Sequence, residues 1–228
     1  MSSFKNKKVL ITGGASGIGL LLGKKALDKG AELLIIWDIN TLLMEEEIAK
    51  LKALGNSVIG FTVDVSSADS VATAATKLIH NNQIPDLLIL NAGVVSGKFF
   101  HEHQKGEIEQ TIGVNVLGCM LPARAFLPDM IKRGSGHLVS ISSAAGMLAN
   151  PKMAVYAASK WAVYGWSESV RLEMQQLKTG VKVTTVTPSY IDTGMFDGVK
   201  VNIFLPKLST EKAVRLILNG IERNKKFV

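Results

Sequence analysis

Tyr156 and Lys160 are the residues whose types and spacing suggest chemistry most directly. Because they lie four positions apart, a helix would place both side chains on one face. A phenol with a pKa of about 10 is a poor base at neutral pH, but a neighbouring ammonium favours the phenolate and lowers that pKa. Ser143, 13 residues before Tyr156, could donate a hydrogen bond to an oxygen that gains negative charge. The three residues predict proton transfer at an alcohol or carbonyl oxygen, although the Tyr–Lys spacing alone fits an ordinary amphipathic helix at least as well.

A glycine-rich turn near the N-terminus predicts a dinucleotide site. The apolar run 9–12 leads directly into the stretch TGGASGIG, residues 12–19. Glycines let the backbone turn sharply, and they let a pyrophosphate approach the N–H groups at the start of the next helix. Such turns also occur without a ligand, so the motif alone is not decisive. The residues expected to contact the cofactor here are Gly13, Ser16, Gly17, Ile18 and Gly19.

Asp38 strengthens the dinucleotide prediction. It ends the second apolar run, 19 residues after Gly19, where a carboxylate can accept hydrogen bonds from the adenosine ribose hydroxyls. A carboxylate would also repel a 2′-phosphate, and no Lys or Arg lies among residues 13–19 or beside Asp38. The sequence therefore favours NAD over NADP. The alternative is that Asp38 merely begins a turn, since Asp-Ile-Asn is a common turn composition.

Two more predicted strand ends fit the same site. Asp64 and Val65 could meet the adenine, and the small residues of Asn91-Ala92-Gly93 would let a ribose lie near the backbone. With a nicotinamide bound, Tyr156 would remove the alcohol proton as hydride leaves, or return it in the reverse direction. The combination of these motifs, rather than any one of them, predicts hydride transfer.

The elements that must position these residues alternate between strands and helices. Short apolar runs that are hydrophobic on both faces are typical of a parallel sheet, and their alternation with amphipathic stretches predicts a doubly wound α/β Rossmann fold. Residues 1–228 are expected to form a single domain with strand order 3-2-1-4-5-6-7, in which the C-terminal KKFV looks like the start of a shortened seventh strand. The expected strands are 9–12, 32–38, 57–65, 86–90, 137–142 and 181–188, and the main helices 17–29, 41–54, 67–81, 107–132, 154–178 and 209–223.

The composition is that of a globular protein. Of 228 residues, 47% are hydrophobic and 20% charged, which excludes a disordered tail or a coiled coil. Cys119 is the single cysteine and His101 and His103 lack further ligands, so neither a disulfide framework nor a metal site is predicted. The net charge of +7 comes from scattered basic residues, so no nucleic-acid partner is expected. No apolar stretch is long enough for export or for spanning a membrane.

Taken together, these motifs resemble the short-chain dehydrogenase/reductase family over essentially the whole chain. There are two departures: Leu90 stands where the family often has Asn, and Ser189 follows Pro188 where the family usually has Gly. Both would change the cofactor pocket slightly without removing a catalytic group. The matching motifs are TGGASGIG, Asp64, Asn91-Ala92-Gly93, Asn115-Val116, Ser143 within ISSAAG, Tyr156-x-x-x-Lys160, and Pro188 followed by Ile191-Asp192-Thr193.

The resemblance also implies individual roles. Asn115 is expected to distort a long helix and to hold a water that links Lys160 to solvent. Tyr156 and Lys160 would also contact the cofactor, with Lys160 on the ribose hydroxyls. Pro188, Ile191 and Thr193 are likewise expected to bind the cofactor, with Thr193 at the nicotinamide or the phosphates. The substrate side is expected to be an apolar wall, some of which simply packs in the core. Its candidate residues are Ser143, Met147, Met153, Tyr156, Met195 and Phe196.

A finer similarity is to the hydroxysteroid and retinol dehydrogenase branch. Members often carry an N-terminal membrane anchor; none is visible here, so a cytoplasmic protein is expected, with peripheral membrane or lipid-droplet association left open. The family often forms homodimers or homotetramers through the two long helices, here 107–132 and 154–178.

The strongest functional prediction is an NAD(H)-dependent dehydrogenase or reductase acting on a hydrophobic alcohol or ketone, such as a steroid, retinoid or other lipid. The alternative from another class is a non-catalytic NAD-binding sensor, against which the intact Ser143, Tyr156 and Lys160 argue. A lyase or epimerase with the same Tyr–Lys pair would need a larger substrate domain.

Overall fold

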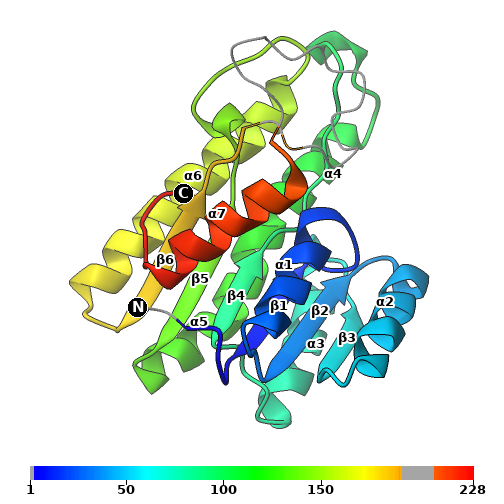
Figure 1. The fold of residues 1–228 in the computed structure, drawn as a ribbon. Coiled ribbons are helices and arrows are strands. Elements are labelled where there is room, and N and C mark those ends of the chain that lie inside the picture. The colour runs from blue at the N-terminus through cyan, green and yellow to red at the C-terminus, as the bar shows by residue number, and fades with distance from the viewer. Residues whose placement is uncertain (1–2, 190, 192–207) are drawn as a thin grey trace.

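The protein is built on one parallel β-sheet (Figure 1). The structure, a computed structural model, describes residues 3–189, 191 and 208–228. All strand pairs are parallel in the order β3-β2-β1-β4-β5-β6, so the predicted Rossmann fold and its order are confirmed for six strands. The strands are β1 (Lys8–Thr12), β2 (Leu33–Asp38), β3 (Val58–Thr62), β4 (Leu87–Leu90), β5 (Gly136–Ile141) and β6 (Val181–Val186).

Helices cover both faces of the sheet, as Figure 1 shows. One face carries α1 (Gly17–Asp28), α2 (Thr41–Ala53) and α7 (Thr210–Glu222), whose buried residues form one apolar cluster. The other carries α3 (Ala68–His80), α5 (Gly118–Arg133) and α6 (Ala154–Gln176), which share a second cluster. Strands buried on both faces explain why the sequence shows continuous apolar runs rather than alternation.

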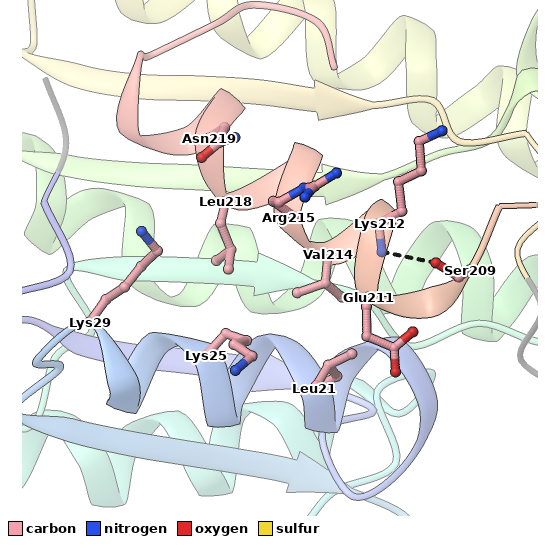
Figure 2. A pocket seen from close by; sticks show the side chains of 10 residues that line it. All are labelled: Leu21, Lys25, Lys29, Ser209, Glu211, Lys212, Val214, Arg215, Leu218 and Asn219. Carbon is pink, nitrogen blue, oxygen red and sulfur yellow. Dashed lines mark hydrogen bonds between the residues drawn. The ribbon is translucent and has the colours of Figure 1, made fainter.

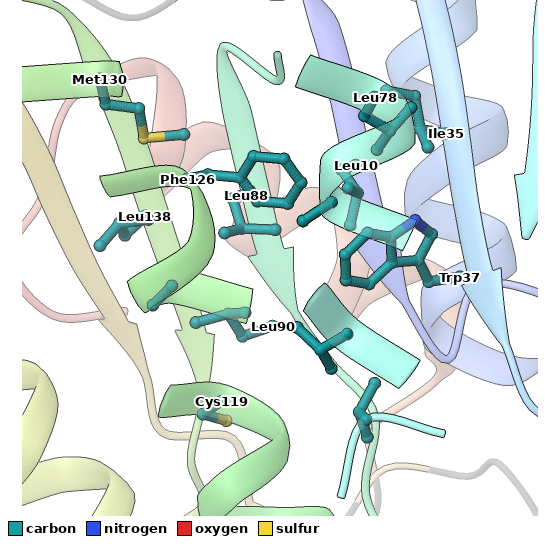
Figure 3. Packing of buried hydrophobic residues seen from close by; sticks show 14 of the residues in the cluster. Leu10, Ile35, Trp37, Leu78, Leu88, Leu90, Cys119, Phe126, Met130 and Leu138 are labelled. Atoms are coloured by element: carbon teal, nitrogen blue, oxygen red, sulfur yellow. The ribbon is translucent and has the colours of Figure 1, made fainter. Parts of the chain in front are cut away.

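Figure 3 shows the cluster under α3, α5 and α6. Leu10 and Leu88 of neighbouring strands point into it, while Ile11 and Ile89, one residue further along, point into the opposite cluster. Trp37 is fully buried with its ring centroid 5.7 Å from that of Phe126. The sheet is therefore a rigid platform, and its carboxyl edge can hold loops in fixed positions.

The winding reverses between β1 and β4. The helix that follows β1 covers one face, and the helices that precede and follow β4 cover the other. In such sheets the ligand crevice lies at the carboxyl ends of the two strands flanking the reversal. Thr12 ends β1, and its hydroxyl accepts hydrogen bonds from the backbone N–H groups of Asn91 and Ala92 after β4, at 3.0 and 3.1 Å.

The long helix predicted over 107–132 is interrupted. It begins as α4 (Glu107–Ile112), passes through a π-helical turn at Gly113–Leu117 and continues as α5. By length and composition alone, the stretch Glu107–Arg133 could cross a membrane, contrary to the expectation that no apolar stretch is long enough. Core helices of soluble proteins meet the same criterion, and α5 contributes Cys119, Ala123, Phe126 and Met130 to the core.

The C-terminus lies beside β6. Phe227 forms an isolated parallel bridge with Thr185, and the Val228 N–H donates to the Thr185 carbonyl at 3.1 Å. The pairing is a single bridge within the described residues, so a seventh strand stays a prediction. The third strand, β3, is shorter than the predicted range 57–65. The chain turns at Asp64, whose carboxylate accepts hydrogen bonds from the Ser66 N–H and hydroxyl.

Candidate active site

Tyr156 and Lys160 lie on the first two turns of α6 at the carboxyl edge of the sheet. They are only 6% and 4% exposed, and the Lys160 Nζ lies 5.6 Å from the centroid of the Tyr156 ring. The same Nζ donates a hydrogen bond of 2.9 Å to the carbonyl of Ile141, where β5 ends. Burial lowers the pKa of Lys160, and burial also raises the pKa of the nearby Cys119 thiol to about 11. An amine therefore faces a phenol in a largely dry site, and in its protonated form that amine favours phenolate.

The two serines after β5 have different surroundings. The Ser142 side chain is buried and donates to the Lys160 carbonyl at 2.8 Å, which ties α6 to the sheet. The Ser143 side chain is half-buried and accepts the Ala145 N–H at 3.1 Å, so its own proton is not used in that bond. Ser143 is therefore the better placed of the two to donate to a bound oxygen.

Asn115 lies inside the π-helical turn and is completely buried. Its Oδ1 accepts the Val94 N–H at 2.8 Å, and its Nδ2 donates to the Val94 carbonyl and to the Ser159 hydroxyl, both at 2.9 Å. The π-turn is the helix distortion that the family resemblance implied. Here it lets one amide hold the loop after β4 against α6.

The glycine-rich turn has the backbone conformation that glycine favours. Gly13 and Gly17 have φ of +63° and +53°, and a Cβ added at Gly17 would meet nothing within 4 Å. At Gly19 an added Cβ would collide with the Gly13 carbonyl and would lie 2.6 Å from Asn91 Nδ2. The turn is thus open on its outer side and closely packed on its inner side. This is the shape that a pyrophosphate at the α1 N-terminus requires. Ser16 and Ile18, the other two predicted contacts there, lie at the N-cap and in the first turn of α1.

Asp38 has two structural bonds. Its Oδ2 accepts the Ala15 N–H and its Oδ1 accepts the Asn40 N–H, each at 3.0 Å. The second bond closes the turn over Asp-Ile-Asn that the alternative interpretation of Asp38 predicted. A carboxylate has about four acceptor positions, so two remain available for ribose hydroxyls. Asp38 can therefore order the glycine-rich turn and bind a ligand as well.

Other predicted site residues fall into four groups. Val65 and Met153 are buried, at 5% and 6% exposure, and a Cβ added at Gly118 would lie 2.7 Å from Val65, so Val65 packs against α5. Met147 is 45% exposed in the loop after β5. Asn91, Ala92, Gly93, Pro188 and Ile191 lie at the carboxyl edge of the sheet, while Thr193, Met195 and Phe196 lie outside the described residues.

Three residues that the motif analysis did not single out support the site. Thr12 joins β1 to β4, Ser142 fixes the carbonyl of Lys160, and Ser159 binds Asn115. Each hydroxyl lies inside or next to a recognised motif, but its partner is distant in the chain. Only Thr12, at the end of an apolar strand, offers a signal that sequence reasoning could have used.

A groove of about 560 Å³ lies elsewhere. Figure 2 shows it between α1 and α7, with Leu21, Val214 and Leu218 at its floor and basic side chains around it. These helices cover the sheet face opposite α6, so the groove does not contain Tyr156 or Lys160. Among the described residues, no group of three or more His, Cys, Asp or Glu side chains could hold a metal ion.

A family model described as short chain dehydrogenase matches residues 7–202. The chain belongs to the short-chain dehydrogenase family. Estradiol 17-beta-dehydrogenase 11 of Homo sapiens is 36% identical over 96% of this chain and 73% of its own length. Short-chain dehydrogenase/reductase family 16C member 6 of Bos taurus is 39% identical over 93% of this chain and 68% of its length. Epidermal retinol dehydrogenase 2 of Homo sapiens is 37% identical over 96% of this chain and 72% of its own length. These relatives confirm the hydroxysteroid and retinol branch, and the family makes the chain a nicotinamide-dependent oxidoreductase.

Solved structures share the fold closely. A short-chain dehydrogenase/reductase from Burkholderia phymatum in complex with NAD matches with a TM-score of 0.89 and 25% identity, over 100% of this chain and 90% of that one. A family member from Sphingobium yanoikuyae in complex with NADPH matches with a TM-score of 0.86 and 25% identity, over 96% and 86%. Both forms of the cofactor therefore occur among similar structures.

Proposed function

We propose that this chain is an NAD(H)-dependent alcohol dehydrogenase or carbonyl reductase for hydrophobic substrates, with residues 1–228 working as one domain. The observation that carries the proposal is the buried Lys160 amine, whose Nζ lies 5.6 Å from the Tyr156 ring centroid at the carboxyl edge of the sheet. A nearby cation makes a phenol a usable proton acceptor near neutral pH. The described residues that line the groove between α1 and α7 include no tyrosine, so that groove offers no equivalent pair.

The chain's own residues fit a dinucleotide. The open outer side of Gly17, the N-terminus of α1 and the free acceptor positions of Asp38 would hold the pyrophosphate and the adenosine ribose. Asp64, Val65, Asn91, Ala92 and Gly93 would line the path from adenine to nicotinamide, with Pro188, Ile191 and Thr193 at its far end. When bound, NAD supplies the hydride acceptor or donor.

The proton steps belong to three side chains. Tyr156 takes the proton from the substrate hydroxyl in oxidation and returns it in reduction. Lys160 stabilises the phenolate and has donor positions left beyond its bond to Ile141, with which to hold ribose hydroxyls. Ser143 donates to the substrate oxygen as negative charge develops on it. Asn115 holds the loop after β4, and so supports the position of Lys160.

The substrate class is proposed from the relatives and from the lining. Estradiol and retinol, in the names of the relatives, are hydrophobic alcohols. Met147, Met153, Met195 and Phe196 would give this chain an adaptable apolar wall of the kind that suits such molecules. We propose a cytoplasmic enzyme that can associate peripherally with a lipid surface, where substrates of this class dissolve.

We further propose a homodimer or homotetramer built on α5 and α6. Large apolar side chains remain exposed along these helices and the π-turn before them, including Leu117 at 43%, Trp161 at 53% and Leu172 at 56%. Exposed apolar residues gathered on long helices are typical of subunit interfaces.

A cofactor-coupled screen tests the function. The protein is incubated with NAD or NADH and a set of sterols, retinoids and aliphatic alcohols and ketones, and NADH absorbance is followed. Tyr156→Phe should abolish turnover and leave NADH binding within about twofold, because only the hydroxyl is lost. Tyr164→Phe is the matched control. Tyr164 lies on the same helix, and its ring stacks on that of Phe227 with the ring centroids 5.7 Å apart. Tight NADH binding without turnover of any substrate would instead favour a non-catalytic sensor.

A further inference from the structure

Ser159 lies on α6 between Tyr156 and Lys160, and it is completely buried. Its hydroxyl donates to the Tyr156 carbonyl at 2.6 Å and accepts from Asn115 Nδ2 at 2.9 Å. The first bond lies within one helix, but the second crosses from α6 to the π-turn that precedes α5. Ser159 therefore joins the turn carrying both catalytic candidates to the distorted segment beside it.

The directions of these bonds leave one arrangement. Because the single Ser159 proton goes to the Tyr156 carbonyl, the hydroxyl can only accept from Asn115. Asn115 then gives one Nδ2 proton to Ser159 and the other to the Val94 carbonyl, while its Oδ1 accepts the Val94 N–H. A flipped amide would set oxygen against oxygen at two of these contacts. The hydroxyl and the amide thus fix each other's orientation.

The same network reaches Lys160. A Cβ built on Gly93 would lie 3.3 Å from Asn115 Oδ1 and 3.6 Å from Lys160 Nζ, so these two side chains converge on one point of the loop after β4. The Ile141 carbonyl holds Nζ from the sheet side at 2.9 Å. A shift of α6 relative to the π-turn would consequently change where Nζ lies relative to the Tyr156 ring.

We propose that Ser159 is a positioning residue that locks this turn of α6 onto Asn115 and thereby sets the separation between the Lys160 ammonium and the Tyr156 phenol. The proposal deepens the proposed function. Its central measurement is the titration of Tyr156, which needs no substrate and no turnover. Failure of the proposed function therefore leaves the positioning role open to test.

The competing interpretation is a serine with a purely structural role. Buried serines in helices often bond to a carbonyl three or four residues earlier, and such bonds need not affect chemistry. Ser167 provides the comparison within the same helix. It is also completely buried, and its hydroxyl accepts from Ser140 and Thr185, both at 2.8 Å, more than a turn beyond Lys160. Loss of either hydroxyl leaves buried groups without a partner.

The experiment compares Ser159→Ala with Ser167→Ala in the full chain without cofactor. Phenolate absorbance is followed against pH, and the same titration with Tyr156→Phe added to each variant isolates Tyr156 among the three tyrosines. Two other titratable groups lie near the phenol: Lys160 faces it, and Cys119 of α5 interacts with Lys160. Burial raises the pKa of the Cys119 thiol to about 11. Ser159→Ala should move the Tyr156 midpoint to higher pH, because the ammonium is held less closely. Ser167→Ala should not.

Turnover provides the second readout once a substrate is known. We expect Ser159→Ala to lower kcat roughly tenfold, with KM for NAD within about twofold and the pH profile displaced in the same direction as the titration. If Ser159→Ala does not fold, Ser159→Cys keeps a weak acceptor in place and should show a smaller shift of the same sign. An unchanged Tyr156 midpoint in the Ser159 variants, or an equal shift in Ser167→Ala, would overturn the positioning role.

Discussion

Replacing Asn115 with leucine removes the side-chain hydrogen bonds by which the π-turn holds Val94 and Ser159, while keeping the number and branching of the side-chain heavy atoms. The wild-type amide satisfies the N–H and the carbonyl of Val94 and also donates to Ser159. Asn115 is completely buried, whereas Val94 is half-buried, so water can partly replace the lost partners on the loop side. An unsatisfied buried polar group costs about 1–3 kcal/mol, and two such groups at the lower half of that range give a loss of about 2–4 kcal/mol.

The loss is measured as the free energy of unfolding in urea and as hydrogen exchange of the Val94 amide. For a chain of this size a loss of about 3 kcal/mol should lower Tm by roughly 6–12 °C. The Val94 amide, protected in the wild type by Asn115 Oδ1, should exchange much faster in the variant. We also expect turnover to fall, because the loop adjoins Lys160.

Thr111→Val is the matched control for this prediction. Thr111 is 2% exposed on α4, and its hydroxyl donates to the Glu107 carbonyl at 2.9 Å within its own helix. Its loss should cost no more than about 1 kcal/mol and leave Val94 exchange unchanged. Equal effects of the two substitutions, or an Asn115→Leu variant as stable as the wild type, would refute the conclusion that Asn115 holds the loop after β4 against the π-turn.

Three further outcomes are expected. Asp38→Asn, which keeps an oxygen for the Ala15 N–H but removes the charge, should weaken NADH binding about tenfold and ease NADPH binding in fluorescence titrations; a wild type that prefers NADPH would contradict this. Burial lowers the pKa of His137 to about 4 from 6.5, so its contribution of up to about 3 kcal/mol is present above pH 6.5 and is lost as pH falls toward 4. The free energy of unfolding of His137→Gln should therefore fall less between pH 7 and pH 4 than that of the wild type, by up to about 3 kcal/mol. Parallel pH dependence of the two proteins would contradict this role of His137. Trp161→Glu, at a side chain 53% exposed on α6, should dissociate the oligomer in light scattering, and a wild type that is a monomer would contradict the proposed interface.

The fold could be predicted from the sequence because its signals are local. Continuous apolar runs such as LLII at 33–36 mark strands covered on both faces, and Ser67 and Ser209 cap α3 and α7 near the expected positions. Strand–helix alternation predicted right-handed crossovers and a doubly wound sheet, and the strand order fits them. The end of β3 was placed three residues late, since Val63 and Val65 are apolar but lie in the turn ordered by Asp64.

The candidate site could be predicted only as far as its motifs extend. The positions of Tyr156, Lys160 and Ser143 came from type and spacing. The choice between Ser142 and Ser143 now has a physical basis in the Ser142 bond to the Lys160 carbonyl. The local bond of Asp38 to Asn40 could be predicted as a turn, but its bond to Ala15 could not, because that bond joins residues 23 positions apart.

By itself, the sequence determined which chemistry the chain carries: a phenol and an amine one helical turn apart, a glycine-rich turn, and strands that end in polar residues. Periodicity and local conformation encode such features directly. The tertiary structure alone decided how they act together, because Asn115, Ser159 and Val94 meet across distances in sequence that no spacing rule covers. Buried hydrogen bonds need partners at about 3 Å, and only the packed sheet and its helices bring those partners to that distance.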